Sequence, residues 1–236
     1  NIEKAFKESK FLAVEVDAVS ALTEEFIDLT LAKGIFLDGQ TLLGILDNPT
    51  KARLREELVS LNLNTEYINF MKPWLAAVTL LQMKLILLGY NPMLGIDFYF
   101  LNKAKGKKEI VELESAEFQI NLLSGLDQNI QLLFLQQTLQ GIDTMKEELD
   151  MFVEYWQTGN IKKVEELVYK SYLENKEFEP LLQSMIIDRN ENISAKIQHY
   201  IETKNIYFVI VGAGHLVGEK GILNILKSKG FKTEQL

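Results

Sequence analysis

A glycine-rich turn near the end of the chain carries the histidine best suited to chemistry. Residues 212–218 read Gly-Ala-Gly-His-Leu-Val-Gly and follow an apolar segment, residues 206–211, that is typical of a buried strand. Open α/β sheets place their ligand-binding groups just beyond such strands. We therefore expect Gly212 and Gly214 to contact a substrate, and the His215 imidazole to bind a metal or move a proton.

The same turn permits two other interpretations. The glycine spacing is close to a dinucleotide-binding fingerprint, and Glu234 lies about 20 residues further on, where a ribose-binding acid would stand. That fingerprint does not require a histidine beside the phosphates, so dinucleotide binding is the weaker reading. The second alternative is that His215 only caps the following helix through its ring.

Two glutamates in short apolar segments form the second group of candidates. We predict strands over residues 11–17 and 109–114, in which apolar side chains alternate with Glu15 and with Glu114. A carboxylate near the core of a sheet is costly unless it is paired, hydrogen-bonded or bound to a metal. The pattern equally allows both glutamates to face solvent on an edge strand. Their lower-ranked neighbours are Asp17 and Glu112.

The tripeptide Asp188-Arg189-Asn190 is the third group and lies within an apolar helical pattern. The Arg189 guanidinium suits bidentate binding of a substrate carboxylate, or it can hold a catalytic glutamate in place. The alternative is a solvated turn between two helices. His199 has no glycine-rich or acidic cluster around it, so we expect it to have no ligand role.

These candidates need a framework that brings distant segments together. We expect strands near residues 11, 109, 206 and 231, with a helix over 216–229 between the last two. Such a strand–helix–strand unit implies parallel pairing. The predicted fold class is therefore α/β, with a small and mostly parallel central sheet and helices on both faces. A long helical insertion at about 117–204 would form one side of the cleft, and residues 1–236 would form a single domain.

Local signals place two further helices. Ser20 or Thr23 is suited to cap a helix that ends near Gly34. Residues 74–88 are strongly apolar, but the run is shorter than the ~20 residues of a transmembrane helix and contains Gln82 and Lys84. We therefore predict a buried core helix there and no integral membrane span.

Composition excludes several classes of site. The 236 residues include no Cys and two His, which rules out disulfides, cysteine nucleophiles, thiolate metal sites and a three-histidine zinc site. The net charge is −8, which argues against nucleic acid as a partner and against a polybasic membrane-surface protein.

Several segments, in a fixed order, carry a family resemblance over almost the whole chain. They are residues 5–9, 12–17, 72–74 (Lys-Pro-Trp), 95–97 (Gly-Ile-Asp), 113–114 with Gln119, 188–190 and 211–218. This set resembles the TraB/GumN family, which is related to the TIKI metalloproteases and, more distantly, to erythromycin esterases and haem-binding ChaN-like proteins.

The resemblance implies a metal-dependent hydrolase, most similar to a peptidase, that acts on a peptide or small-molecule substrate. The implied cofactor is a divalent ion, and a mixed nitrogen and oxygen ligand set suits Mn, Co or Zn. The alternative is a non-catalytic protein that binds a peptide or haem in the same cleft. The matching residues are Glu15, Glu114 and Arg189 for catalysis, Gly212, Gly214 and Asn190 for substrate, and His215 with Glu15 for metal.

One part of the family pattern has no counterpart in these residues. The family's first half-site is a Gly-x-x-His turn after an N-terminal strand, so the resemblance implies a ChaN/TIKI-like fold that lacks its first strand here. Residues 1–4 do not read as a signal peptide. Many bacterial relatives are secreted or lipid-anchored, which implies an extracytoplasmic location and a lipid anchor upstream.

Overall fold

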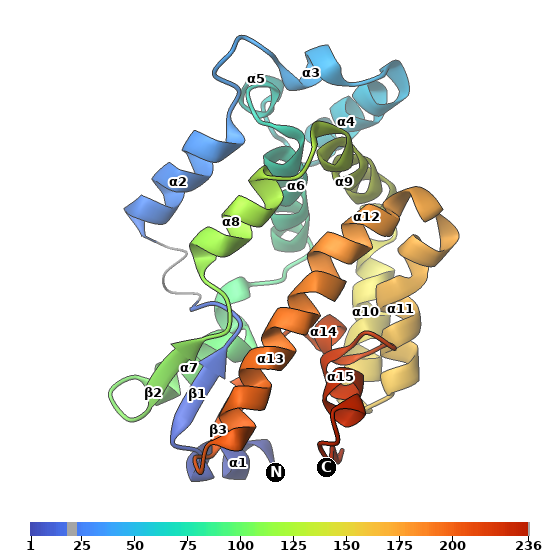
Figure 1. The fold of residues 1–236 in the computed structure, drawn as a ribbon. Helices are drawn as coiled ribbons and strands as arrows, with labels where there is room; N and C mark the ends of the chain where they lie inside the picture. The colour runs from blue at the N-terminus through green and yellow to red at the C-terminus, as the bar shows by residue number, and fades with distance from the viewer. Residues whose placement is uncertain (18–22, 236) are drawn as a thin grey trace.

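The computed structural model describes residues 1–17 and 23–235 and is built around a small parallel sheet (Figure 1). The strands lie in the order β2-β1-β3, and Phe11 of β1 aligns with Glu109 of β2 and with Tyr207 of β3. The predicted α/β class, with a small parallel sheet flanked by many helices, is confirmed. The strands are β1 (Phe11–Val14), β2 (Glu109–Glu112) and β3 (Tyr207–Ile210).

Helices cover both faces of the sheet because side chains alternate along each strand. Leu12 and Val14 pack on one face against a cluster that includes Phe100 of α7. On the other face, Val209 packs with Ile193 of α13. The covering helices are α1 (Ile2–Glu8), α7 (Ile96–Ala104), α13 (Asp188–Glu202) and α15 (Ile222–Ser228).

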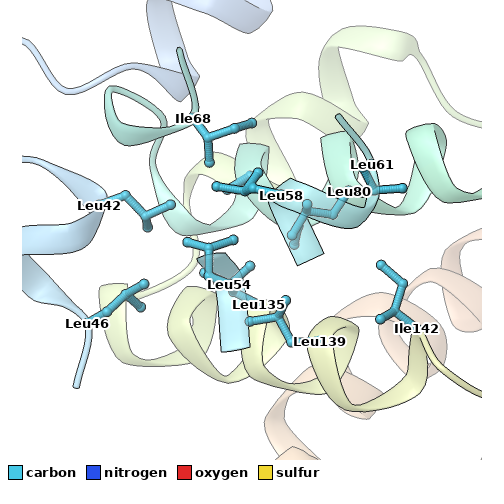
Figure 2. Packing of buried hydrophobic residues seen from close by; sticks show 12 residues of the cluster. Leu42, Leu46, Leu54, Leu58, Leu61, Ile68, Leu80, Leu135, Leu139 and Ile142 are labelled. Atoms are coloured by element: carbon cyan, nitrogen blue, oxygen red, sulfur yellow. The ribbon is translucent and has the colours of Figure 1, made fainter. Parts of the chain in front are cut away.

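A second core lies away from the sheet, among helices that fill the connections between the strands. Figure 2 shows its leucines from α3, α4, α6 and α9 meeting with Ile68 of α5. The helices before β2 are α2 (Glu24–Gly34), α3 (Leu42–Ile45), α4 (Asn48–Ser60), α5 (Thr65–Asn69), α6 (Pro73–Leu87) and η2 (Pro92–Leu94). Those between β2 and α13 are α8 (Ala116–Ser124), α9 (Gln128–Gly141), α10 (Met145–Gln157), α11 (Ile161–Glu174), η3 (Lys176–Phe178), α12 (Glu179–Leu182) and the π-helical turn η4 (Gln183–Ile187).

Helix α6 confirms the helix predicted over 74–88. Its first half is buried, including Trp74 and Leu80, whereas Ile86 and Leu87 near its end are 57% and 62% exposed. Among the residues that the structure describes, no helix is both long enough and apolar enough to span a membrane. Thr23 caps α2 by accepting a hydrogen bond from Phe26 N–H, and the other proposed cap, Ser20, lies outside the described residues.

The C-terminal strand–helix–strand unit was predicted wrongly. Residues 231–235 form no strand, and Leu236 lies outside the described residues. The segment is held differently: Phe231 packs in the cluster around Ile222, and Gln235 Nε2 donates to the Gly159 carbonyl at 2.9 Å. The helix predicted over 216–229 is two helices, α14 (Ala213–Leu216) and α15, because residues 217–221 form a turn.

Candidate functional site

The carboxyl ends of all three strands meet at one edge of the sheet. The predicted strands were too long, because β1 ends at Val14 and β2 at Glu112, so Glu15 and Glu114 lie just beyond them rather than within them. Backbone hydrogen bonds continue past the strand ends, with Glu114 N–H donating to the Glu15 carbonyl at 2.7 Å. Because Gly212 follows β3 at the same edge, the three candidate segments come together there.

Arg189 holds the two glutamates in one ion cluster. Its Nε donates to both oxygens of Glu114 at 3.0 and 3.1 Å, and its Nη2 donates to Glu114 Oε2 at 2.7 Å and to Glu15 Oε1 at 2.5 Å. Nη1 donates to the Met185 carbonyl at 3.1 Å. The Glu114 side chain is 4% exposed and that of Glu15 is 23% exposed. Glu114 is therefore a buried carboxylate neutralised by a guanidinium, and only Glu15 has access to solvent.

Gln119, on the first turn of α8, ties the two carboxylates to each other. Its Nε2 donates to Glu15 Oε1 at 3.2 Å and to Glu114 Oε2 at 3.1 Å. The other Glu15 oxygen accepts from Gly212 N–H at 3.2 Å. Burial raises the pKa of Glu15, but the Arg189 guanidinium and this N–H donor outweigh it and lower the pKa below 4.5. The Glu15 carboxylate is thus ionised at neutral pH.

Asn190 fixes the tautomer of His215. Asn190 Nδ2 donates to the Lys220 carbonyl at 2.8 Å, which directs its Oδ1 at His215 Nδ1, 2.7 Å away. An amide oxygen only accepts, so Nδ1 carries the hydrogen and the lone pair of the neutral ring is on Nε2. That Nε2 lies 3.9 Å from Glu15 Oε1. The structure therefore places an imidazole nitrogen with an available lone pair beside an ionised carboxylate.

Burial keeps His215 neutral. Its side chain is 7% exposed, and this burial, helped by the Arg189 charge, lowers the pKa below 6.5 despite the nearby glutamates. The unfolded chain takes up a proton near pH 6.5 while the folded protein does not, so stability is full above that pH and falls below it.

We accordingly expect a His215→Gln variant to lose less stability than the parent protein between about pH 7 and pH 5. Urea unfolding at a series of pH values measures this slope, with the exposed His199→Gln as the matched control. Equal slopes for the parent and the His215→Gln protein would contradict a buried, neutral His215.

Helix α11 shapes the glycine turn from outside, through residues that the sequence analysis missed. Gly218 has φ +87°, and a Cβ there would lie 2.7 Å from the Tyr169 ring. Tyr169 O–H also donates to the Val217 carbonyl at 3.3 Å, and Val168 packs against Gly214. These are contacts between segments about 50 residues apart, and no local sequence signal indicates them.

The remaining candidates are distributed differently. The Asp17 N–H donates to the Glu112 carboxylate at 2.7 Å, so these two residues contact each other. His199 is exposed on α13, and the centre of its ring lies 6.3 Å from that of Tyr200. Trp74 of the Lys-Pro-Trp segment is a core residue. Asp97 was quoted in the resemblance but given no role. It is half-buried, and desolvation followed by the charge of Glu15 raises its pKa above 3.8.

The residues at the strand ends fit part of the ligand set of a divalent ion. His215 Nε2 and the Glu15 carboxylate have the right chemistry, and Asn190 orients the ring as an outer hydrogen-bond partner does in many metal sites. Catalytic sites typically use three protein ligands. Residues 1–17 and 23–235 contain no group of three or more His, Asp and Glu placed to hold a metal. The described residues thus offer two candidate ligands, His215 and Glu15, one fewer than a catalytic metal site typically uses.

Comparison with known proteins gives one match. The model of the TraB/PrgY/gumN family matches residues 1–235, essentially the whole chain. No curated protein and no solved structure matches the chain.

Proposed function

Because this chain belongs to the TraB/PrgY/gumN family, we propose that it is a metal-dependent hydrolase, peptidase-like, whose substrate is a peptide or another small molecule. The observation that carries the proposal is the neutral His215 ring with its Nε2 lone pair beside ionised Glu15. These two residues would hold the ion, together with ligands from water or substrate. A bound divalent ion lowers the pKa of its water and polarises a carbonyl group.

The chain's other residues position these two ligands. Arg189 and Gln119 fix the Glu15 carboxylate from one side, and the Gly212 N–H fixes it from the other. Asn190 holds the His215 ring in the tautomer that leaves Nε2 available. The resemblance implied a catalytic role for Arg189 and Glu114. Since most Arg189 N–H groups already donate to protein oxygens, including those of Glu114, we assign both residues to positioning instead.

A non-catalytic peptide- or haem-binding protein is the second candidate. The observation that favours it is that the described residues supply two protein ligands for a metal rather than three. Such a protein would retain the ion cluster beside His215 and would bind its ligand without turnover.

The test combines metal analysis with a cleavage assay. After equilibration with Mn, Co or Zn and removal of excess ion, we expect the parent protein to retain metal and to cleave members of a mixed peptide library detected by mass spectrometry. His215→Ala should lower both metal content and cleavage by at least about 100-fold, and the exposed His199→Ala should change neither. Peptide binding without cleavage, or cleavage that His215→Ala leaves intact, would contradict the hydrolase proposal.

A further inference from the structure

The amino edge of the sheet, opposite Glu15 and His215, carries a concentration of positive charge that we call the lysine pole. Residues 1–10 and 103–108 contain seven lysines and two glutamates, which gives +5 in a chain whose net charge is −8. The other 220 residues therefore carry −13. These two segments precede β1 and β2, so the parallel pairing of the strands brings them together. The lysines are Lys4, Lys7, Lys10, Lys103, Lys105, Lys107 and Lys108.

Four of these lysines line one cavity of about 310 Å³ together with Glu3 and Phe6. Two of the four are fixed by the fold. Lys103 Nζ donates to both Glu3 oxygens at 2.7 and 2.9 Å, and Lys108 Nζ contacts the Ser9 carbonyl and lies 4.7 Å from the centre of the Phe6 ring. The other two lining lysines, Lys7 and Lys107, are exposed.

We propose that this cavity binds phosphate groups, presented by a soluble polyphosphorylated molecule or by a lipid headgroup. The cavity is lined by four lysines and by one acidic residue, Glu3. Because Lys103 forms an ion pair with Glu3, the other three lysines leave three positive charges for a ligand. Residues 1–10 and 103–108 contain no Arg, so the positive charge of the lysine pole comes from compact ammonium groups rather than from planar guanidinium forks. Lysine acts as a point charge on phosphate, and several lysines around one hollow match a multiply charged anion.

The lysine cavity is separate from the site proposed for hydrolysis. Each strand has four residues, so the two edges of the sheet are roughly 13 Å apart. Binding at the lysine pole therefore does not require the hydrolase proposal to hold, and neither His215 nor Glu15 takes part in it. The net charge of −8 argued against nucleic acid as a partner and against a polybasic membrane-surface protein, but this total includes a local surplus of positive charge at the lysine pole.

The test measures binding of inorganic tripolyphosphate by calorimetry, with EDTA present to exclude metal-bridged binding. A second arm measures cosedimentation with phosphatidylcholine vesicles with and without phosphatidic acid. The test variant is Lys7→Gln/Lys107→Gln, which removes two exposed charges. The matched control is Lys33→Gln/Lys162→Gln, which removes the same charge from exposed positions elsewhere.

We expect saturable binding in at least one arm, weakened about tenfold by Lys7→Gln/Lys107→Gln and unchanged by the control pair. Tripolyphosphate binding indicates a soluble ligand, and binding confined to phosphatidic acid vesicles indicates a lipid headgroup. Absence of binding in both arms overturns the proposal, and so does an equal loss in both double variants. Thermal unfolding of each variant shows that the folded state is retained.

Discussion

Replacing Arg189 with Met is expected to lower the free energy of unfolding by about 3–5 kcal/mol, the largest effect of any single change considered. The Glu114 carboxylate is 4% exposed and accepts three of its hydrogen bonds from this guanidinium. Without Arg189, the buried Glu114 carboxylate keeps the Gln119 amide as its one side-chain partner among the described residues, and the cost is that of an uncompensated ion. Urea unfolding monitored by circular dichroism measures the loss.

Two companion variants identify the cause of that loss. Adding Glu114→Gln to Arg189→Met removes the stranded charge and should recover at least about half of the lost stability. The exposed Arg55→Met, which also removes one positive charge, should stay within about 0.5 kcal/mol of the parent. A double variant as unstable as Arg189→Met alone would show that packing of the arginine, rather than charge pairing, is what matters.

The second large effect is expected at Gly218. A Gly218→Ala protein should lose about 2–4 kcal/mol, because the backbone has φ +87° and the new Cβ would lie 2.7–2.9 Å from atoms of the Tyr169 ring. Gly230 separates the two contributions, since it has φ +89° with no atom within 4 Å of an added Cβ. Gly230→Ala should therefore cost only about 1 kcal/mol.

Overlap with Tyr169 also predicts coupling between the two positions. In the Gly218→Ala/Tyr169→Ala protein the ring is gone, so the double variant should be more stable than the sum of the single losses by about 1 kcal/mol or more. Chemical denaturation of all four proteins gives the coupling energy. If the losses of the two single variants simply add in the double variant, the cost of Gly218→Ala comes from its backbone conformation alone. Tyr169 would then have no part in shaping the turn beside His215.

Local sequence patterns located the elements of the fold, but tertiary contacts set where those elements end. The alternation around Leu12 and Val14 identified β1, because its side chains face two helical layers, but the pattern could not show that pairing ends at Val14. The strand predicted near residue 231 was wrong, because Phe231 packs against a helix rather than in a β-ladder. Phe231 removes apolar surface from water by packing against α15, without pairing in the sheet.

The sequence predicted which residues belong to the site but not which of them contact each other. Arg189 was expected either to bind substrate or to hold a glutamate, and only the geometry shows that its donors go to Glu114 and Glu15. Asn190 was assigned to substrate binding, yet its side chain bonds to His215 and to a backbone carbonyl. Such partners are separated by 25 to 174 residues, a range at which spacing carries no information.

The parallel sheet has a consequence for how the protein folds. Phe11 pairs with Glu109 and with Tyr207, partners that are 98 and 196 positions away in the chain, so every ladder contact closes a very long loop. Contacts of that sequence separation form slowly, and those of the helical core close somewhat shorter loops, such as the 81 positions between Leu54 and Leu135. During synthesis β3 emerges 196 residues after β1. We therefore expect the helical core around Leu54 and Leu135 to assemble before β3 joins the sheet, and the ion cluster with His215, which needs β3 in place, to form late in folding.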